Sequence, residues 1–249
     1  MAQPTNTFDT YDAVGIREDL QDVIYSISPT DTPFMSSAAR EAVKNTLHEW
    51  QTDALAAAST SNAVVEGDDA ALDASVATVR IGNHTQIMDK TVVITGTQEA
   101  VDKAGRASEL AYQIAKKSKE LKRDIESTLL TNQARVAGDS STARKFGSIG
   151  AFIATNDNFA SDGTSPTAAD GSDARNDGTQ RALTEDMLKS VIKGTWNSGG
   201  SPSVIMVGPF NKQKISGFTG GSTRFDASED KTLYTSIDVY SSDFGDLEV

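Results

Sequence analysis

A helical pattern that runs from about Thr97 to Ala134 constrains the fold more than any other feature of the chain. Thr95, with Gln98 three residues later, predicts a capping box at its start. Small and apolar residues then recur at intervals of three or four, at Val101, Ala104, Ala107, Ala111, Ile114, Ser118, Leu121, Ile125 and Leu129. This spacing predicts a helix that buries one narrow stripe of side chains.

The length of this pattern also bears on the shape of the subunit. Gly105 is its weakest position, so a short first turn is expected there, followed by a main helix from about Ser108. At about 1.5 Å per residue the helix is expected to be roughly 40 to 55 Å long. A compact globule of 249 residues is only about 46 Å across. A helix of this length favours a flat or extended subunit.

The composition excludes several classes of protein. Thirty-five acidic against 23 basic residues give a formal net charge of -12, which disfavours indiscriminate binding to nucleic acid or to anionic membranes. The chain has no cysteine, which excludes disulfides and thiolate metal sites. Residues 1–12 do not resemble a secretory signal, and the longest strongly apolar run, 204–207, is far too short to cross a membrane. We expect a soluble intracellular protein.

The first 95 residues are predicted to form an arm and a projecting loop. Apolar spacing in 16–27 predicts a short amphipathic helix that ends at Pro29, and the prolines of 28–35 predict an extended, turn-rich path. Residues 46–52 alternate like a strand, and 76–95 predict one long strand or two separated near Gly82. An isolated hairpin is marginally stable in water, so we expect this two-stranded loop to lie on a partner.

The second half of the chain is predicted to contain a loop-rich insertion and a small α/β domain. Residues 138–182 are dense in small polar residues, and their apolar anchors are Phe146, Ile149, Phe152, Ile153 and Phe159. A helix is predicted from Thr184 to Gly199, a buried strand at 203–208, a short helix from Pro209 to Ile215, and strands at 233–240 and at the C-terminus. The domain is expected to be incomplete at its C-terminus.

No motif predicts catalysis. His48 and His84 both fall in the predicted two-stranded loop, where a polar, solvent-facing role is the simpler interpretation. A faint calcium-loop pattern begins at Asp173, but Arg175 and Thr184 stand where oxygen ligands belong. The sequence contains no zinc-binding helix, phosphate-binding loop or dinucleotide fingerprint. We therefore predict no catalytic, cofactor-binding or metal-binding residue, and no enzyme.

Four segments carry a resemblance to a known family. They are Ser-Pro-Thr-Asp-Thr-Pro-Phe at 28–34, Asn-Thr-Leu-His-Glu-Trp-Gln-Thr-Asp at 45–53, Gly-Thr-Gln-Glu-Ala at 96–100 and Lys-Glu-Leu-Lys-Arg-Asp at 119–124. In this order they resemble the major capsid proteins of tailed bacteriophages (Caudoviricetes), over roughly residues 7–135 and more weakly over 183–249. The resemblance covers more than half of the chain.

The resemblance implies an α+β chain with the Hong Kong 97-like fold. The N-terminal arm would be residues 1–45, the extended β loop 46–95, the long spine helix of the peripheral domain 96–137, and the axial α/β domain 183–249. The insertion at 138–182 matches no signature of the family. That family is usually longer than 249 residues, which also favours a missing C-terminal segment.

The implied function is assembly. Copies of the chain would form hexamers and pentamers that close an icosahedral shell around phage double-stranded DNA, which they would hold without sequence-specific binding. Portal, scaffolding and decoration proteins would be further partners, no membrane would be involved, and assembly in the bacterial cytoplasm would place the protein in the virion capsid. Some relatives cross-link through a lysine and an asparagine, but no such pair is identified here and no cross-link is predicted.

Charge suggests how neighbouring copies would meet. The projecting loop carries Glu66, Asp68 and Asp69, and the predicted spine helix carries a basic cluster of Lys116, Lys117, Lys119, Lys122 and Arg123. We expect the acidic loop to lie on the basic helix of a neighbour. The alternative is a solvated helix face with its own pairs, Lys116 with Glu120 and Lys122 with Glu126.

Two other functions remain open from the sequence. A cargo-holding nanocompartment shell protein has the same fold and differs in enclosing no viral genome. A soluble hydrolase or sugar-binding module would use the insertion rich in Asp, Ser and Gly together with the carboxylates, and would be a monomer or small oligomer stabilised by its ligand.

Overall fold

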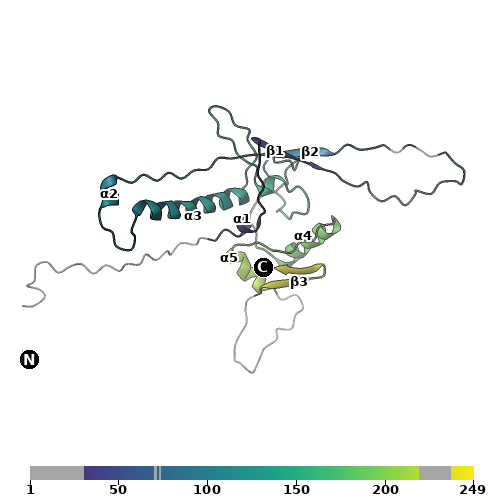
Figure 1. Cartoon of the computed structure of the whole chain (residues 1–249). Helices are drawn as coiled ribbons and strands as arrows, with labels where there is room; N and C mark the ends of the chain where they lie inside the picture. Colours follow the sequence, from purple (N-terminus) through teal and green to yellow (C-terminus); the bar gives the residue numbers. More distant parts are fainter. Residues whose placement is uncertain (1–30, 70–71, 73, 219–236) are drawn as a thin grey trace, which may run out of the picture. The chain divides into compact units, whose positions relative to one another are not determined.

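The computed structural model describes residues 31–69, 72, 74–218 and 237–249, which mix helices and strands as an α+β chain (Figure 1). These residues fall into two compact units. One contains 31–32 and Asp89–Arg123, and the other contains Pro33–Met88 and Asp124–Val249. The helix predicted at 16–27 and the residues 233–236 of a predicted strand lie outside the described residues.

The long helical pattern forms two helices, α2 (Gly96–Ala100) and α3 (Glu109–Leu130). The predicted cap of α2 is confirmed, because the Thr95 side chain accepts a hydrogen bond from the backbone N–H of Gln98. Gly105 adopts φ +74° between the two helices, so the predicted break is confirmed there. A single run to Ala134 is wrong, since α3 has 22 residues and is about 33 Å long.

A side chain of α2 caps the start of α3. One carboxylate oxygen of Glu99 accepts hydrogen bonds from the N–H groups of Glu109 (3.0 Å) and Leu110 (3.3 Å), which lack partners within the helix. The predicted buried stripe is wrong, because none of its residues is buried. Val101 and Ile114 are 57% and 51% exposed. A 3.6-residue period marks the face that can be covered, but nothing in the described part of this chain covers it at these two positions.

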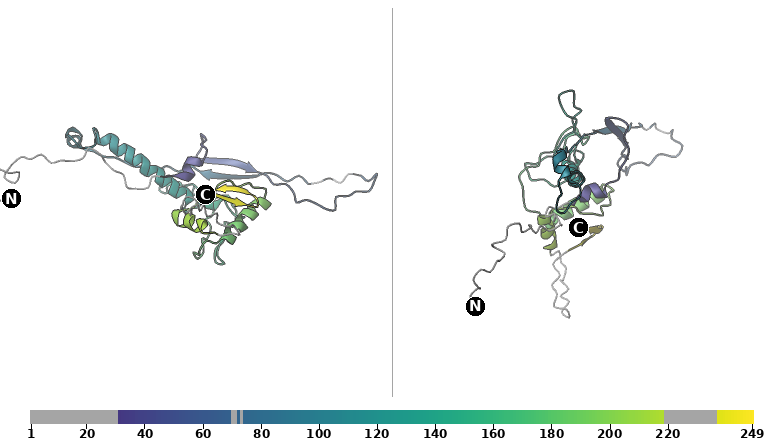
Figure 2. Two further views of the ribbon diagram at one scale, coloured as in Figure 1. Left: turned by 90° about the horizontal axis from the view of Figure 1, so that it is seen from below. Right: turned by 60° about the vertical axis from the view of Figure 1, so that its left-hand side comes forward.

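Strands β1 (Leu47–Thr52) and β2 (Val79–His84) form an antiparallel pair in which Leu47 lies opposite His84 (Figure 2). The strand predicted at 46–52 is confirmed, but the second strand is much shorter than 76–95. Gly82 does not separate two strands, since it lies within β2 opposite Glu49. A Cβ there would come within 2.8 Å of Glu49 Cγ and of the His48 carbonyl oxygen, so glycine is required by close backbone approach.

The segment that precedes β1 contains a short helix, α1 (Pro33–Ser37), where an extended path is predicted. The two carboxylate oxygens of Glu126, on α3, accept hydrogen bonds from the N–H groups of Phe34 (2.9 Å) and Met35 (2.7 Å). Pro33 suits the first helical position because its missing N–H would have no partner there. Glu126, which is 92 positions from Phe34 in the sequence, therefore accepts hydrogen bonds from the free N–H groups at the start of α1.

Residues 138–182 have little regular structure, as predicted. Apart from the 3₁₀ turn η1 (Ile149–Ala151), the backbone is held by isolated bridges between Val136 and Lys145 and between Thr164 and Asn176. Ser148 and Ala151 are completely buried. This segment is therefore irregular but packed, with an interior of its own.

The C-terminal part contains α4 (Glu185–Asn197), α5 (Pro209–Ser216), and the antiparallel strands β3 (Val239–Ser242) and β4 (Gly245–Glu248). Thr184 caps α4, and both predicted helices are confirmed. The buried strand predicted at 203–208 is wrong. Only Val204 makes a bridge, to Glu248, and Val204 and Met206 are 49% and 46% exposed.

Candidate assembly interface

The loop between β1 and β2, residues 53–78, carries apolar side chains that no described residue covers. Figure 2 shows this loop continuing beyond the ends of both strands. Five of its side chains are at least 76% exposed, namely Leu55, Val64, Val65, Leu72 and Val76. Several uncovered apolar side chains in one loop favour a segment that binds another molecule.

The three predicted acidic contact residues lie in one turn of this loop. The N–H of Asp68 donates to the carbonyl of Val65 (3.1 Å), and Gly67 takes φ +84° between them. Glu66, Asp68 and Asp69 are all exposed. None of them forms an ion pair with another described residue, so their charge is available to a partner.

The predicted basic contact residues lie on α3 and are likewise outside any ion pair. Lys116, Lys119, Lys122 and Arg123 are exposed, and none has an ion-pair partner in the described parts of the chain. Lys116, Lys119 and Arg123 are three and four positions apart and so share one face of the helix. The predicted intrahelical pairs are not formed: Glu120 binds Lys117 instead (2.6 Å), and Glu126 binds α1.

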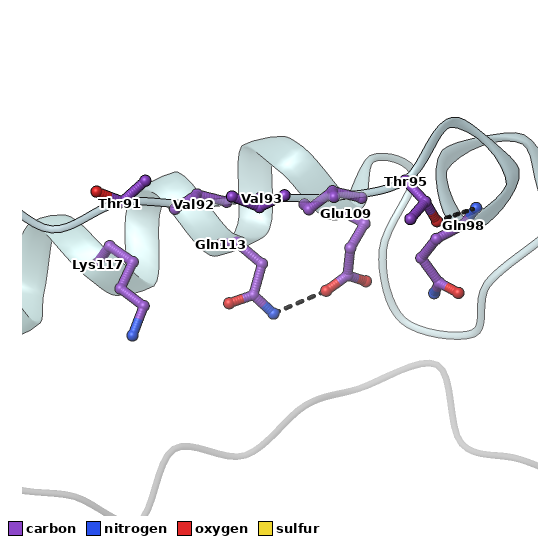
Figure 3. A pocket seen from close by; sticks show the side chains of 9 residues that line it. Thr91, Val92, Val93, Thr95, Gln98, Glu109, Gln113 and Lys117 are labelled. Carbon is purple, nitrogen blue, oxygen red and sulfur yellow. Dashed lines mark hydrogen bonds between the residues drawn. The ribbon is translucent and has the colours of Figure 1, made fainter.

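A groove that the sequence did not reveal lies along the first half of α3 (Figure 3). It has a volume of about 520 Å³ and lies between the segment 91–95 and α3. Glu109, Gln113 and Lys117 project from the same side of α3, and the opposite wall contains Val92, Val93 and Ile94. Val93 is 88% exposed. The sequence predicted a strand over these residues, but it could not show that α3 lies alongside them.

The polar wall of the groove is already satisfied internally. The buried Glu109 carboxylate accepts hydrogen bonds from Gln113 Nε2 (2.7 Å) and from Arg106. The hydrogen bond from Gln113, followed by that from Arg106, lowers the pKa of Glu109. The groove therefore offers a partner its apolar wall, without an unpaired carboxylate.

A second cavity, of about 680 Å³, lies between α4 and β3. Glu185 forms an ion pair with Lys189 (2.8 Å), and the Tyr240 hydroxyl lies 3.5 Å from the same carboxylate. Burial, with a smaller contribution from Glu185, raises the pKa of Tyr240, and the hydrogen bond to Glu185 raises the pKa of Lys189. Glu185 thus interacts with both Lys189 and Tyr240, and these three polar side chains satisfy one another.

The two histidines lie on β1 and β2. Their predicted solvent-facing position is wrong, because both are half-buried. The His48 ring lies 5.9 Å from that of Trp50, and His84 Nδ1 is buried without a hydrogen-bond partner. Within the described ranges no three His, Cys, Asp or Glu side chains are arranged to hold a metal, and the helices there are too short or too polar to serve as membrane spans.

Three carboxylates of the insertion form hydrogen bonds that stabilise its turns. Asp162 binds Thr179, Asp170 binds Ser172 and Arg135, and Asp173 binds the backbone of Thr167. These hydrogen bonds lower the pKa of all three aspartates. A general acid in a hydrolase needs a raised pKa, so this pattern favours a structural role.

Asp139 gives a prediction about pH. The Ser141 hydroxyl, and then the N–H groups of Ser141 and Thr142, lower the pKa of Asp139 from 3.8 to about 2. Because the pKa of Asp139 is lower in the folded turn than in the unfolded chain, the ionised carboxylate stabilises the turn at pH values above the unfolded pKa. This stabilisation is lost as the pH falls through the pKa of the folded turn. We expect faster exchange of the Ser141 and Thr142 amide hydrogens, after correction for intrinsic rates, between about pH 4 and pH 2.

Asp139→Asn is the matched control for this prediction. It keeps an acceptor oxygen but cannot titrate, so the acid-dependent change at these two amides should disappear. An identical pH profile in the Asn variant would show that another group controls the turn.

An uncovered apolar loop and exposed charges of both signs are typical of a surface that binds other molecules. Residues 3–249 match the sequence family of the SU10 major capsid protein, and the chain belongs to this family. It is 44% identical over 135 residues to the major capsid protein of Escherichia phage Phieco32. The match covers 54% of this chain and 38% of that protein, so the chain spans well under two thirds of its relative. Membership of the phage capsid family, predicted from the sequence, is confirmed.

Proposed function

We propose that this protein is the shell-forming subunit of a tailed-phage capsid, in which hexamers and pentamers close an icosahedral shell around double-stranded DNA. The observation that carries the proposal is the exposure of Leu55, Val64, Val65, Leu72 and Val76. Full burial of a Val or Leu side chain is worth about 1.5 to 3 kcal/mol, and a shell repeats that gain at every subunit. Neighbouring copies are the natural source of cover.

The fold proposed for the subunit is Hong Kong 97-like. Residues 1–45 would be the arm, 46–95 the extended loop, 96–137 the spine of the peripheral domain, 138–182 an insertion and 183–249 the axial domain. Support comes from the order of elements: a hairpin with a long loop, then a 22-residue helix, then a small domain of helices and strands.

Within the shell, we place the acidic turn of the loop on α3 of a neighbouring copy. Glu66, Asp68 and Asp69 would face Lys116, Lys119, Lys122 and Arg123, all exposed and outside any ion pair within the described chain. Each exposed pair contributes about 0.2 to 1 kcal/mol, so the set matters through repetition. Val64 and Val65, next to the acids, would enter the groove beside Val92 and Val93, where apolar surface is also exposed.

The subunit is proposed to have no catalytic role and no cofactor. Portal, scaffolding and decoration proteins are its proposed further partners, in the host cytoplasm during assembly and in the virion afterwards. DNA would be enclosed without sequence-specific contacts, consistent with a net charge of -12.

Velocity sedimentation of the purified protein tests this function. We expect particles far larger than a 26.4 kDa monomer, with nucleic acid extractable from those made during infection. Large particles that contain protein cargo and no viral genome would instead identify a nanocompartment. A monomer or small oligomer at high concentration would contradict a shell function of either kind.

A further inference from the structure

The base of the β1–β2 hairpin is tied to the loops that follow α3, whereas its outer loop is not. We call residues 133–135, 144–148 and 170–171 the clamp. The first two stretches bind β2 or the residues that follow it. The third stretch binds Arg135 of the first. By contrast, the hydrogen bonds described for 53–78 stay within this loop or reach only the outer ends of the strands, as between Thr78 and Gln51 (2.9 Å). The hydrogen bonds described between this hairpin and other parts of its unit are therefore concentrated at one end.

Asn83 of β2 is the central contact of the clamp. Its amide nitrogen donates to the carbonyl of Gly147 (3.0 Å), and its carbonyl oxygen accepts from the N–H of Gly147 (2.7 Å). One side chain thus satisfies both backbone groups of a buried residue. A Cβ on Gly147 would lie 3.2 Å from the carbonyl oxygen of Gly171 and from the Phe152 ring, so Gly147 is packed closely against these two residues.

Gln133 forms the second contact. Its side-chain nitrogen donates to the Phe146 carbonyl (2.7 Å) and lies 3.4 Å from the Gln86 side-chain oxygen, which also accepts from the N–H of Phe146 (3.3 Å). Its backbone exchanges hydrogen bonds with the buried Ser148, whose hydroxyl accepts from the Gln133 N–H (3.1 Å). The residues just after β2 and just after α3 therefore share one network.

Arg135 adds a charged contact. Its guanidinium donates to the carbonyl of Gly82, within β2, and forms an ion pair with Asp170 (3.1 Å). The backbone N–H of Arg135 donates to the carbonyl of Gly171 (2.7 Å). On the other strand, the Trp50 ring lies 5.8 Å from that of Phe152. Both strands are therefore anchored, β2 by hydrogen bonds and β1 by an aromatic contact.

We propose that the clamp fixes the direction in which the hairpin leaves the rest of its unit, so that the loop is aimed at a neighbour before assembly begins. Asn83, Gln133 and Arg135 are its positioning residues. This proposal rests on the proposed shell function and explains what the insertion contributes to it. Holding the hairpin in one orientation beforehand lowers the conformational entropy lost when the loop docks.

The absence of cysteine from the chain allows a direct measurement. Ala54→Cys, just beyond β1, and Asn197→Cys, at the end of α4, introduce spin labels at two exposed positions of the same unit. Distances between the labels are then measured by pulsed EPR in dissociated, full-length subunits. We expect one narrow distance distribution in the parent protein and its loss in the Asn83→Ala/Gln133→Ala variant, with helical circular dichroism retained.

Two further variants make the experiment decisive. Gln51→Ala removes the hydrogen bond to Thr78 at the outer end of the hairpin and should leave the distribution narrow. Asn83→Asp keeps the acceptor for the Gly147 N–H but loses the donor, so it should broaden the distribution even if the double variant does not fold. A narrow distribution in folded Asn83→Asp would overturn the proposal.

The particles that the same variants assemble into are examined in a separate experiment. We expect irregular or open particles from the clamp variants and closed shells from Gln51→Ala. Regular shells built from subunits with a broadened distribution would overturn the role of the clamp in assembly. If the parent protein forms no shell, the proposed function fails, while the distance measurement still decides whether the clamp orients the hairpin.

Discussion

Replacing Glu66, Asp68 and Asp69 together by lysine is expected to abolish shell formation while leaving the subunit folded. The three carboxylates are exposed and outside any ion pair within the described chain, so their replacement removes no internal pair there. Across the proposed contact, however, each change turns an attraction toward α3 into a repulsion, and the effect recurs at every subunit. Electron microscopy and velocity sedimentation should show unassembled subunits, and circular dichroism should match that of the parent.

A charge swap provides the control for this variant. Lys116→Glu, Lys119→Glu and Arg123→Glu on α3 should abolish shells by the same repulsion, and combining both sets of changes should restore them at least in part. High salt should weaken both effects, because exposed charges are screened over about 8 Å at physiological ionic strength and over less at higher salt. Normal shells from the triple lysine variant would show that the acidic turn does not form this contact.

Gly171→Ala, in the insertion, should produce a large loss of stability. Gly171 has φ +83°, where a side chain costs about 1 to 2 kcal/mol. An added Cβ would also lie 2.5 Å from Phe152 Cζ, and overpacking of this kind costs about 1 to 3 kcal/mol more. We expect a loss of about 2 to 5 kcal/mol in the free energy of unfolding, measured by denaturant titration of dissociated subunits.

Gly199→Ala separates the two causes of that loss. Gly199 follows the C-cap of α4 with a nearly identical φ of +82°, but no neighbouring atom lies within 4 Å of the position that an added Cβ would take. Gly199→Ala should therefore lower the free energy of unfolding only through the strain of a side chain at positive φ, by about 1 to 2 kcal/mol. Equal losses in the two variants would show that contact with Phe152 does not contribute.

Local signals in the sequence predicted the ends of helices well. Thr95 and Thr184 cap helices through their own side chains, and Gly105 breaks the helical pattern with a positive φ. Each of these effects depends on residues within a few positions, so it can be predicted from the sequence alone. The exposed acidic and basic clusters were also found from the sequence, because charged residues that gather in one segment need no knowledge of the fold.

Contacts between distant residues could not be predicted in this way. Glu126 has the helical spacing of a partner for Lys122, yet it binds the start of α1. The clamp depends on pairs such as Asn83 and Gly147, which are 64 positions apart and of ordinary residue types. The buried strand predicted at 203–208 is wrong for another reason: apolar residues predict burial only where the chain itself supplies the cover.

Cryo-electron microscopy of the assembled protein tests the central claim most directly. The account predicts a closed icosahedral shell in which residues 53–78 of each subunit lie on another copy, with the acidic turn against the basic face of α3. A protein that stays monomeric at high concentration, or a shell in which this loop faces solvent, would contradict it.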